Sequence, residues 1–215
     1  MTKRLQVLAS LIEKCKTFAD VGCDHGYISE YVLKNDLANK VIISDISKKS
    51  LQKAQTLLKG YEDKVLSYNC DGVKDYDGKA DQIFIAGMGG EEIAKIIKNI
   101  EFLPEKFILC PHKNAQIVRE LLLKKGYYLK RDFTFLAGSK FYDAVVAIKG
   151  NDEYSTLELI FGRENLQTLT SDFIEFLHSK KVKYQNILKA QILSKNQVLL
   201  IKEKLNQIEE ILNEH

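Results

Sequence analysis

The fold of this chain is decided by one stretch, Phe18-Ala19-Asp20-Val21-Gly22-Cys23-Asp24-His25-Gly26-Tyr27. It begins as an apolar strand and runs into a tight turn that contains two glycines, with carboxylates on Asp20 and Asp24. Glycine lets the backbone approach a ligand closely because it has no Cβ atom. The stretch is therefore typical of the ligand-binding end of the first strand in a nucleotide-binding α/β fold.

The acidity of this turn favours one kind of ligand. Carboxylates disfavour a bound pyrophosphate and suit a ligand that carries positive charge. Gly22 and Gly26 do not form the G-x-G-x-x-G dinucleotide fingerprint, and glycines at a strand-to-helix turn also occur for steric reasons alone. Among nucleotide-type ligands, the turn favours S-adenosylmethionine over NAD.

Short β-type runs alternate with helical patterns over the first 150 residues, which predicts a parallel sheet covered by helices. We expect strands at 17–21, 40–44, 65–69, 81–85 and 106–110, and helices at 28–35, 48–58, 91–99 and 115–125. After Gly126 two β-rich runs, 127–136 and 140–149, are joined by Ala137-Gly138-Ser139, which predicts a hairpin. A mostly parallel, Rossmann-like sheet that ends in an antiparallel hairpin is the architecture of class I methyltransferases.

Beyond Asn151 the chain is helical in character. One series of apolar residues at three/four spacing runs from Phe173 to Ile192, and a second runs from Val198 to Leu212 after a break at Ser194-Lys195-Asn196. We interpret the two series as an antiparallel coiled-coil hairpin, the alternative being two helices that pack back on the sheet. The predicted division is a cofactor-binding domain at 1–152 and a C-terminal helical domain at 153–215.

Composition and charge exclude several classes of protein. The four cysteines are far apart and lack CxxC spacing, so neither a zinc site nor a disulfide framework is expected, and no metal is predicted. No signal peptide or membrane-spanning run is expected, and we predict a cytoplasmic monomer. Residues 1–150 carry a net charge of +5 and residues 151–215 a net charge of −2. The basic N-terminal part is compatible with a polyanionic partner.

Polar motifs follow four successive predicted strands, at the end of the sheet where open α/β folds bind ligands. The candidate cofactor-binding residues are Asp20, Gly22, Cys23, Asp24, His25, Gly26, Asp45, Ile46, Cys70, Asp71, Gly72, Ala86, Gly87, Met88 and Gly89. Asp45 lies 23 residues after Gly22, the distance expected of a carboxylate that binds ribose hydroxyls. An N-cap role is the alternative, although Ser47 can cap that helix instead.

The motifs Asp20-Val21-Gly22-Cys23-Asp24-His25-Gly26-Tyr27 and Ala86-Gly87-Met88-Gly89-Gly90, with the basic Lys3-Arg4-Leu5 and the trailing coiled coil, resemble the bacterial tRNA (adenine-22-N1)-methyltransferase family. The resemblance covers essentially the whole chain. It implies methyl transfer from S-adenosylmethionine to N1 of adenine 22 in the tRNA D-arm. One departure is Cys110-Pro111-His112, where the family usually has Gln-Pro-Asn.

This resemblance assigns further roles. Candidate catalytic residues are Asp24, Asp71 and Met88, and candidate RNA-binding residues are Lys3, Arg4, Tyr27, His112, Lys130 and Arg131. His25 is either a donor to cofactor or substrate or a turn residue bonded to backbone, and Tyr27 is either a stacking surface or a core residue. Three alternatives stay open: a methyltransferase with another RNA or small-molecule acceptor, an NAD-dependent oxidoreductase, and a non-catalytic RNA-binding scaffold.

Overall fold

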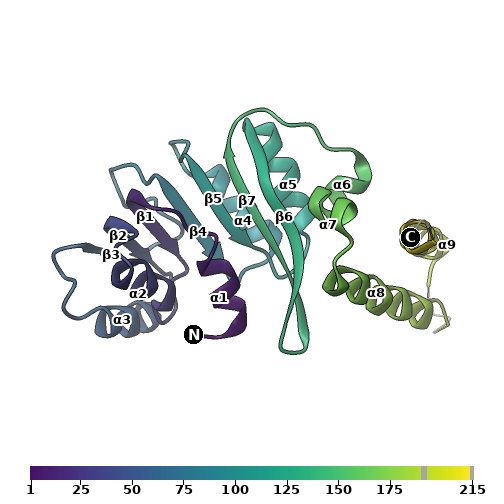
Figure 1. Ribbon diagram of the computed structural model, residues 1–215, viewed down its shortest axis with the longest axis horizontal. Helices are drawn as coiled ribbons and strands as arrows, with labels where there is room; N and C mark the ends of the chain where they lie inside the picture. Colours follow the sequence, from purple (N-terminus) through teal and green to yellow (C-terminus); the bar gives the residue numbers. More distant parts are fainter. Residues whose placement is uncertain (190–192, 214–215) are drawn as a thin grey trace.

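The computed structural model describes residues 1–189 and 193–213. Its centre is a seven-stranded sheet with the order β3-β2-β1-β4-β5-β7-β6 (Figure 1). The strands are β1 Cys15–Val21, β2 Ala38–Ser44, β3 Val65–Tyr68, β4 Gln82–Ala86, β5 Lys106–Cys110, β6 Tyr127–Ala137 and β7 Lys140–Lys149. The first five are parallel, and β7 runs antiparallel to both β5 and β6. The predicted class I sheet with its terminal hairpin is confirmed.

Helices cover both faces of this sheet. The helices are α1 Lys3–Ala9, α2 Tyr27–Lys34, α3 Lys48–Leu57, α4 Gly90–Lys98, α5 Ala115–Lys124, α6 Thr156–Phe161, α7 Arg163–Thr168, α8 Ser171–Lys189 and α9 Lys195–Asn213. Side chains alternate along the strands, so that Phe18 packs with α1, α2 and α3 while the next residue, Ala19, packs with α4 and α5. Two buried apolar clusters therefore sandwich the sheet.

The predicted element boundaries agree with the structure to within two residues. Asp81, expected as the first residue of a strand, lies just before β4, where its backbone N–H donates to the Thr17 carbonyl oxygen and its Oδ2 accepts from the N–H groups of Lys16 and Thr17. The hairpin turn is shorter than expected, since Ala137 belongs to β6. A β-bulge interrupts β6 between Leu129 and Arg131 and had no sequence signal of its own.

The C-terminal segment forms the predicted helical pair. Helices α8 and α9 pack against each other and extend away from the sheet (Figure 1). The first half of α8 contacts the hairpin, where Phe176 packs edge-to-face on Phe141 with ring centroids 5.6 Å apart. The expected break at Ser194-Lys195-Asn196 is wrong for its last two residues, because Ser194 caps α9 through the Gln197 N–H and the helix begins at Lys195. The predicted apolar position Ile192 lies outside the described residues.

The edge of the sheet at β6 is covered by side chains of the C-terminal segment. Backbone N–H groups along β6 donate to carboxylate or amide oxygens: Leu129 to Asp152, Asp132 to Glu164, Thr134 to Asn165, and Leu136 to Asp172. An unpaired edge strand exposes a row of donors and acceptors that other strands can bind. These four acceptors satisfy outward-facing donors of β6 and attach the segment that leads to the helical pair.

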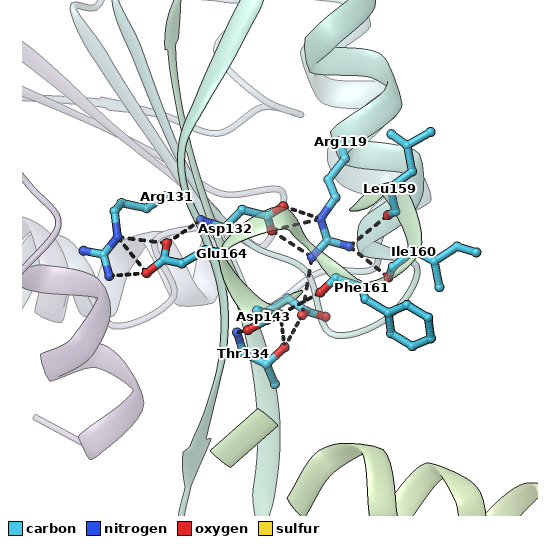
Figure 2. Close-up of polar contacts among 10 residues, drawn as sticks. Arg119, Arg131, Asp132, Thr134, Asp143, Leu159, Ile160, Phe161 and Glu164 are labelled. Atoms are coloured by element: carbon cyan, nitrogen blue, oxygen red, sulfur yellow. Dashed lines mark hydrogen bonds and ion pairs between the residues drawn. The ribbon is translucent and has the colours of Figure 1, made fainter. Parts of the chain in front are cut away.

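A buried arginine strengthens the same junction (Figure 2). Arg119 of α5 is 1% exposed, and its Nε donates to both carboxylate oxygens of Asp132 at 2.9 Å. Its Nη1 donates to the carbonyl oxygens of Leu159 and Ile160 in α6, at 3.1 and 3.2 Å. A buried guanidinium requires such partners, because its desolvation is costly. Arg119 thereby joins α5, β6 and α6.

Within residues 1–189 and 193–213, no helix combines the length and the apolar character that a bilayer crossing requires.

Candidate functional site

One cavity of about 680 Å³ lies at the carboxyl ends of the parallel strands. All of the predicted cofactor-binding residues line it except Gly26 and Gly89. Of the predicted RNA-binding residues, Arg4, Tyr27 and His112 also line it. The sheet therefore brings together motifs that are separated by up to about a hundred residues in the sequence, as expected where parallel strands end at a common edge.

The two glycines that do not line the cavity shape the helices beside it. Gly26 is the N-cap residue of α2 with φ +78°, and a Cβ atom there would lie 3.0 Å from the Cβ of Ala54 in α3. Gly89 precedes α4, and its backbone N–H donates to the Glu92 carboxylate at 3.0 Å. In the structure these two glycines thus serve helix packing and helix capping, and a contact of either with a cofactor stays a prediction.

The turn after β1 is fastened to the end of β2. The N–H groups of Gly22 and Cys23 both donate to the carbonyl oxygen of Ser44, at 2.8 and 3.0 Å. The N–H of Asp24 donates to Asp45 Oδ2 at 3.1 Å, which holds Asp24 at φ +47°. The turn thus keeps Asp24 in a left-handed backbone conformation, which is uncommon for a residue with a side chain. The backbone from which the Asp24 carboxylate extends is therefore fixed at the cavity.

Asp45 does not cap α3. Its Oδ1 accepts from the Ser47 N–H at 2.7 Å, whereas Ser47 itself is the N-cap, with its Oγ accepting from the Ser50 N–H. The Asn69 amide donates to the carbonyl oxygens of Asp45 and Ile46 and holds this segment in place. The Asp45 carboxylate lines the cavity and keeps acceptor capacity for a ligand, because a carboxylate offers about four lone-pair directions.

Asp20 is the deepest carboxylate of the cavity and is only 3% exposed. Burial raises its pKa to about 6, although the Ser29 hydroxyl donates to its Oδ2 at 2.7 Å and opposes that rise. Burial also raises the pKa of the neighbouring Cys23 thiol, which is consequently protonated at neutral pH. This part of the cavity offers a carboxylate whose charge is poorly solvated, and a cationic group bound beside it would stabilise that charge.

Two glycines at the cavity have different roles. A Cβ atom on Gly22 would lie 2.3 Å from the Met88 Cε, so Met88 packs directly over this glycine. Gly87 has φ +87°, and a Cβ atom there would meet no atom of the described residues within 4 Å. The backbone at Gly87 is therefore accessible at close range, as binding of a nucleoside-type cofactor requires, whereas Gly22 makes room for the Met88 side chain.

An acid–imidazole pair stands at the cavity rim. His25 Nδ1 lies 2.9 Å from Asp24 Oδ2, and His25 Nε2 lies 3.3 Å from the Lys53 ammonium. The imidazole ring stacks on Tyr27, with ring centroids 5.6 Å apart and planes inclined by 7°. The His25 ring is thus bonded through the side chains of Asp24 and Lys53. Tyr27 is 46% exposed and is not a core residue.

The charge of the cavity is predominantly negative. Five carboxylates line it, on Asp20, Asp24, Asp45, Asp71 and Glu92, together with two permanently cationic side chains, Arg4 and Lys95. Lys95 pairs with Asp71 at 3.3 Å, which leaves most of the negative charge uncompensated by the chain itself. Such a cavity suits a cationic ligand and disfavours a pyrophosphate.

A family model described as a methyltransferase domain matches residues 1–145. The chain belongs to this methyltransferase family. It is 33% identical over 157 residues to the tRNA (adenine(22)-N(1))-methyltransferase of Bacillus subtilis strain 168, a match that covers 70% of this chain. The match spans 66% of the length of that relative, slightly less than two thirds.

Solved structures resemble this methyltransferase over its whole length. The crystal structure of the B. subtilis m1A22 tRNA methyltransferase TrmK has a TM-score of 0.83 and 27% identity, with 100% of this chain and 97% of that one covered. M. capricolum TrmK in complex with S-adenosyl-homocysteine has a TM-score of 0.90, with 99% and 98% covered; at 23% identity it shows the fold alone. The resemblance stated from the motifs is confirmed as TrmK-like.

Three predicted RNA-binding residues of the methyltransferase do not line the cavity. Lys3 is exposed at the start of α1. Lys130 pairs with Glu13 at 3.0 Å, and Arg131 forms a two-pronged pair with Glu164. Leu129, the residue before Lys130, pairs with Ala147 of β7, and Ala147 pairs with Phe107 near the start of β5. This part of β6 therefore lies toward the amino ends of the parallel strands. Lys130 and Arg131 therefore make structural ion pairs away from the cavity.

Sequence reasoning missed several residues that line the cavity: Leu5, Val21, Ile28, Phe84, Glu92, Lys95 and Ile96. Glu92 and Lys95 had a usable signal, since they occupy the first two turns of a helix that begins at Gly90, the last residue of the Ala86-to-Gly90 motif. The apolar residues had none, because strand and helix residues that face a cavity are indistinguishable in sequence from those that face the core.

Proposed function

We propose that this methyltransferase transfers a methyl group from S-adenosylmethionine to N1 of adenine 22 in the D-arm of tRNA. The observation that carries the proposal is the acidic cavity built from the Gly22–Gly26 turn, Asp45, Asp71 and the Ala86–Met88 segment. Its support is the similarity to the B. subtilis tRNA (adenine(22)-N(1))-methyltransferase. Fold alone would not identify the acceptor, because this fold hosts many functions.

The cavity has the groups that S-adenosylmethionine needs. Asp45 is the proposed acceptor for the ribose hydroxyls, and the Asp71–Gly72 segment is the proposed neighbour of the adenine edge. The backbone at Gly87 allows close approach, and Asp20 and Asp24 complement positive charge. S-adenosylmethionine supplies an electrophilic methyl group on a positively charged sulfur. The negative charge of the cavity fits that sulfonium and the ammonium of its amino acid part.

The acceptor requires positioning more than it requires proton transfer. N1 of neutral adenine carries an in-plane lone pair, so no general base has to deprotonate it, and the methylated ring is cationic. We propose that Asp24 and Asp71 stabilise this charge and that Met88 packs against the reacting groups. N1 faces the partner base in a duplex, so the adenine has to leave its stack, and the exposed ring of Tyr27 offers a stacking surface.

The direct test is to incubate the protein with S-adenosylmethionine and a tRNA transcript, digest the tRNA, and identify the product nucleoside by mass spectrometry. We expect N1-methyladenosine, and none when a guanine replaces adenine 22. Methylation of another nucleoside would contradict the proposed acceptor. Calorimetry with S-adenosylhomocysteine and with NAD covers the oxidoreductase alternative, because binding of NAD alone would exclude a methyltransferase.

A further inference from the structure

The cavity contains one cationic side chain, Arg4, that forms no ion pair with the described residues. Lys95 is neutralised by Asp71 at 3.3 Å. Arg4, the other permanently cationic side chain of the cavity, makes no ion pair in residues 1–189 and 193–213, although it is only partly exposed. A guanidinium carries five donors, and leaving it without an anion in a partly buried position forgoes its strongest interactions. Its placement therefore needs an explanation beyond packing.

The hairpin fixes the position of Arg4. The guanidinium carbon of Arg4 lies 5.4 Å from the ring centroid of Tyr142, within the range of a cation–π interaction. Tyr142 is held in turn by stacking on Phe135, at 5.8 Å, and it packs near His112, at 6.3 Å. Tyr142 itself does not line the cavity, whereas Arg4 and His112 do. The guanidinium is thus presented to the cavity by β6 and β7.

We propose that Arg4 binds a phosphate of the acceptor nucleotide, and that Tyr142 is a positioning residue that orients the guanidinium for it. The inference rests on the proposed function and specifies how an acidic cavity accepts a polyanion. A planar guanidinium binds phosphate oxygens in pairs, and in this cavity it offsets the repulsion that five carboxylates exert on RNA.

The position of Arg4 favours the acceptor side of the cavity. Arg4 and His112, which follows β5, both lie near Tyr142 of the β6–β7 hairpin. Asp45 and Asp71, the proposed partners of the cofactor's nucleoside, follow β2 and β3 on the other side of the sheet order. The amino acid carboxylate of the cofactor is the second anion that a guanidinium could bind, so the experiment has to separate these two sources.

The main test compares Arg4→Gln with Lys14→Gln, which removes the same charge from an exposed residue outside the cavity. With a tRNA transcript, we expect Arg4→Gln to raise KM for tRNA by about tenfold to a hundredfold and to lower the salt dependence of binding by about one phosphate contact. Lys14→Gln is expected to stay within about twofold of the wild type. Affinity for S-adenosylhomocysteine, measured by calorimetry, should be the same in all three proteins.

Two results of that comparison would overturn the inference. If Arg4→Gln and Lys14→Gln change KM equally, Arg4 contributes only general charge. If Arg4→Gln weakens binding of S-adenosylhomocysteine as much as that of tRNA, the guanidinium binds the cofactor carboxylate.

A second measurement does not depend on methylation. Adenosine and its 5′- and 3′-monophosphates are titrated into the protein saturated with S-adenosylhomocysteine and followed by NMR chemical shifts. We expect at least one monophosphate to bind about tenfold more tightly than adenosine to the wild type, and equally to Arg4→Gln. If adenosine and both monophosphates bind the wild type with equal affinity, the inference is contradicted. If this discrimination holds while no tRNA is methylated, the proposed function fails and phosphate binding by Arg4 stands.

The role of Tyr142 is tested by Tyr142→Phe and Tyr142→Leu. Phenylalanine keeps the ring face and should preserve KM, whereas leucine should raise KM without lowering kcat in proportion. In the Arg4→Gln background, Tyr142→Leu should have little further effect on KM, because its role is exerted through Arg4. Additive effects of the two substitutions would show that Tyr142 is merely part of the packing.

Discussion

Residues of the Gly22–Gly26 turn make hydrogen bonds and ring contacts within the fold, and these contacts limit how the residues can bind a ligand. Asp24 has a positive φ, and its backbone N–H is bonded to Asp45, so the two carboxylates that follow β1 and β2 are coupled. Asp24 also bonds to His25, which stacks on Tyr27. A substitution at any of these residues therefore shifts the others. Each variant has to be tested for folding stability as well as for ligand affinity.

We expect Asp45→Ala to weaken binding of S-adenosylhomocysteine by about tenfold or more, because a charged acceptor for the ribose hydroxyls is lost. The fold should persist, since the N–H groups of Asp24 and Ser47 that lose their acceptor are exposed to water. Calorimetry measures the affinity, and Asp63→Ala, at an exposed aspartate outside the cavity, is the matched control. Unchanged affinity would show that Asp45 is not a cofactor ligand.

The buried carboxyl group of Asp20 should make the stability of the fold depend on pH. Burial raises its pKa from 3.8 to about 6, so the folded state holds this proton more tightly than the unfolded state does. The charged form is the costly one, so the contribution of Asp20 to wild-type stability should fall as pH rises through the window between these two values. Asp20→Asn keeps an acceptor for the Ser29 hydroxyl and removes the charge.

Urea unfolding of the ligand-free protein measures this effect. Relative to the wild type, Asp20→Asn should gain stability between about pH 4 and pH 7, by up to about 3 kcal/mol. A stability difference that stays constant over this range would contradict the raised pKa of Asp20.

Glycine and carboxylate side chains that follow a strand gave a usable sequence signal, because the structure places most of them around one cavity; their role toward a cofactor stays a prediction. The ion pairs of Lys130 and Arg131 could not be predicted, because their partners Glu13 and Glu164 are distant in sequence and are brought close by the fold alone. The sequence also could not separate Gly26, which precedes a helix and packs against Ala54, from Gly22, which borders the cavity. A glycine that needs a positive φ gives the same signal in both cases.

At the scale of elements, the edge strand β6 depends on the helices that follow it. Asn165 of α7 is fully buried, and its Oδ1 accepts from the Thr134 N–H at 2.8 Å. Its Nδ2 donates to the Phe161 carbonyl oxygen and to the Thr134 hydroxyl. One amide thereby joins β6 to the short helices α6 and α7, which the sequence pattern did not reveal because each is less than two turns long.

We expect Asn165→Leu to lower the free energy of unfolding by about 2–4 kcal/mol, since it leaves a buried N–H and a buried carbonyl without partners at nearly unchanged volume. Gln167→Leu, at an exposed residue of the same helix, should change it by less than about 0.5 kcal/mol. Denaturant unfolding monitors both, and hydrogen exchange should show lost protection at Thr134. Equal stability of the two variants would mean that the β6 edge does not depend on this amide.

At the scale of the whole molecule, the polar network around Arg119 bears on the predicted division into 1–152 and 153–215, which we retain as a proposal. Arg119 and β6 belong to the first part, and their partners on α6, α7 and α8 belong to the second. The alternation of strands and helices predicted the first part, and the apolar spacing predicted the helical pair. The hydrogen bonds of the buried Arg119 to α6 had no periodic signal, because they depend on groups that only the fold brings together.

The most direct test of the central claim is primer extension on tRNA treated with the protein and S-adenosylmethionine. A methyl group on N1 blocks the Watson–Crick edge of adenine, so reverse transcriptase should stop one nucleotide 3′ of position 22. That stop should require the cofactor and should disappear from a transcript with guanine at position 22. A stop at another adenine, or full-length extension of a tRNA that is otherwise bound and intact, would contradict the assignment of adenine 22 as the acceptor.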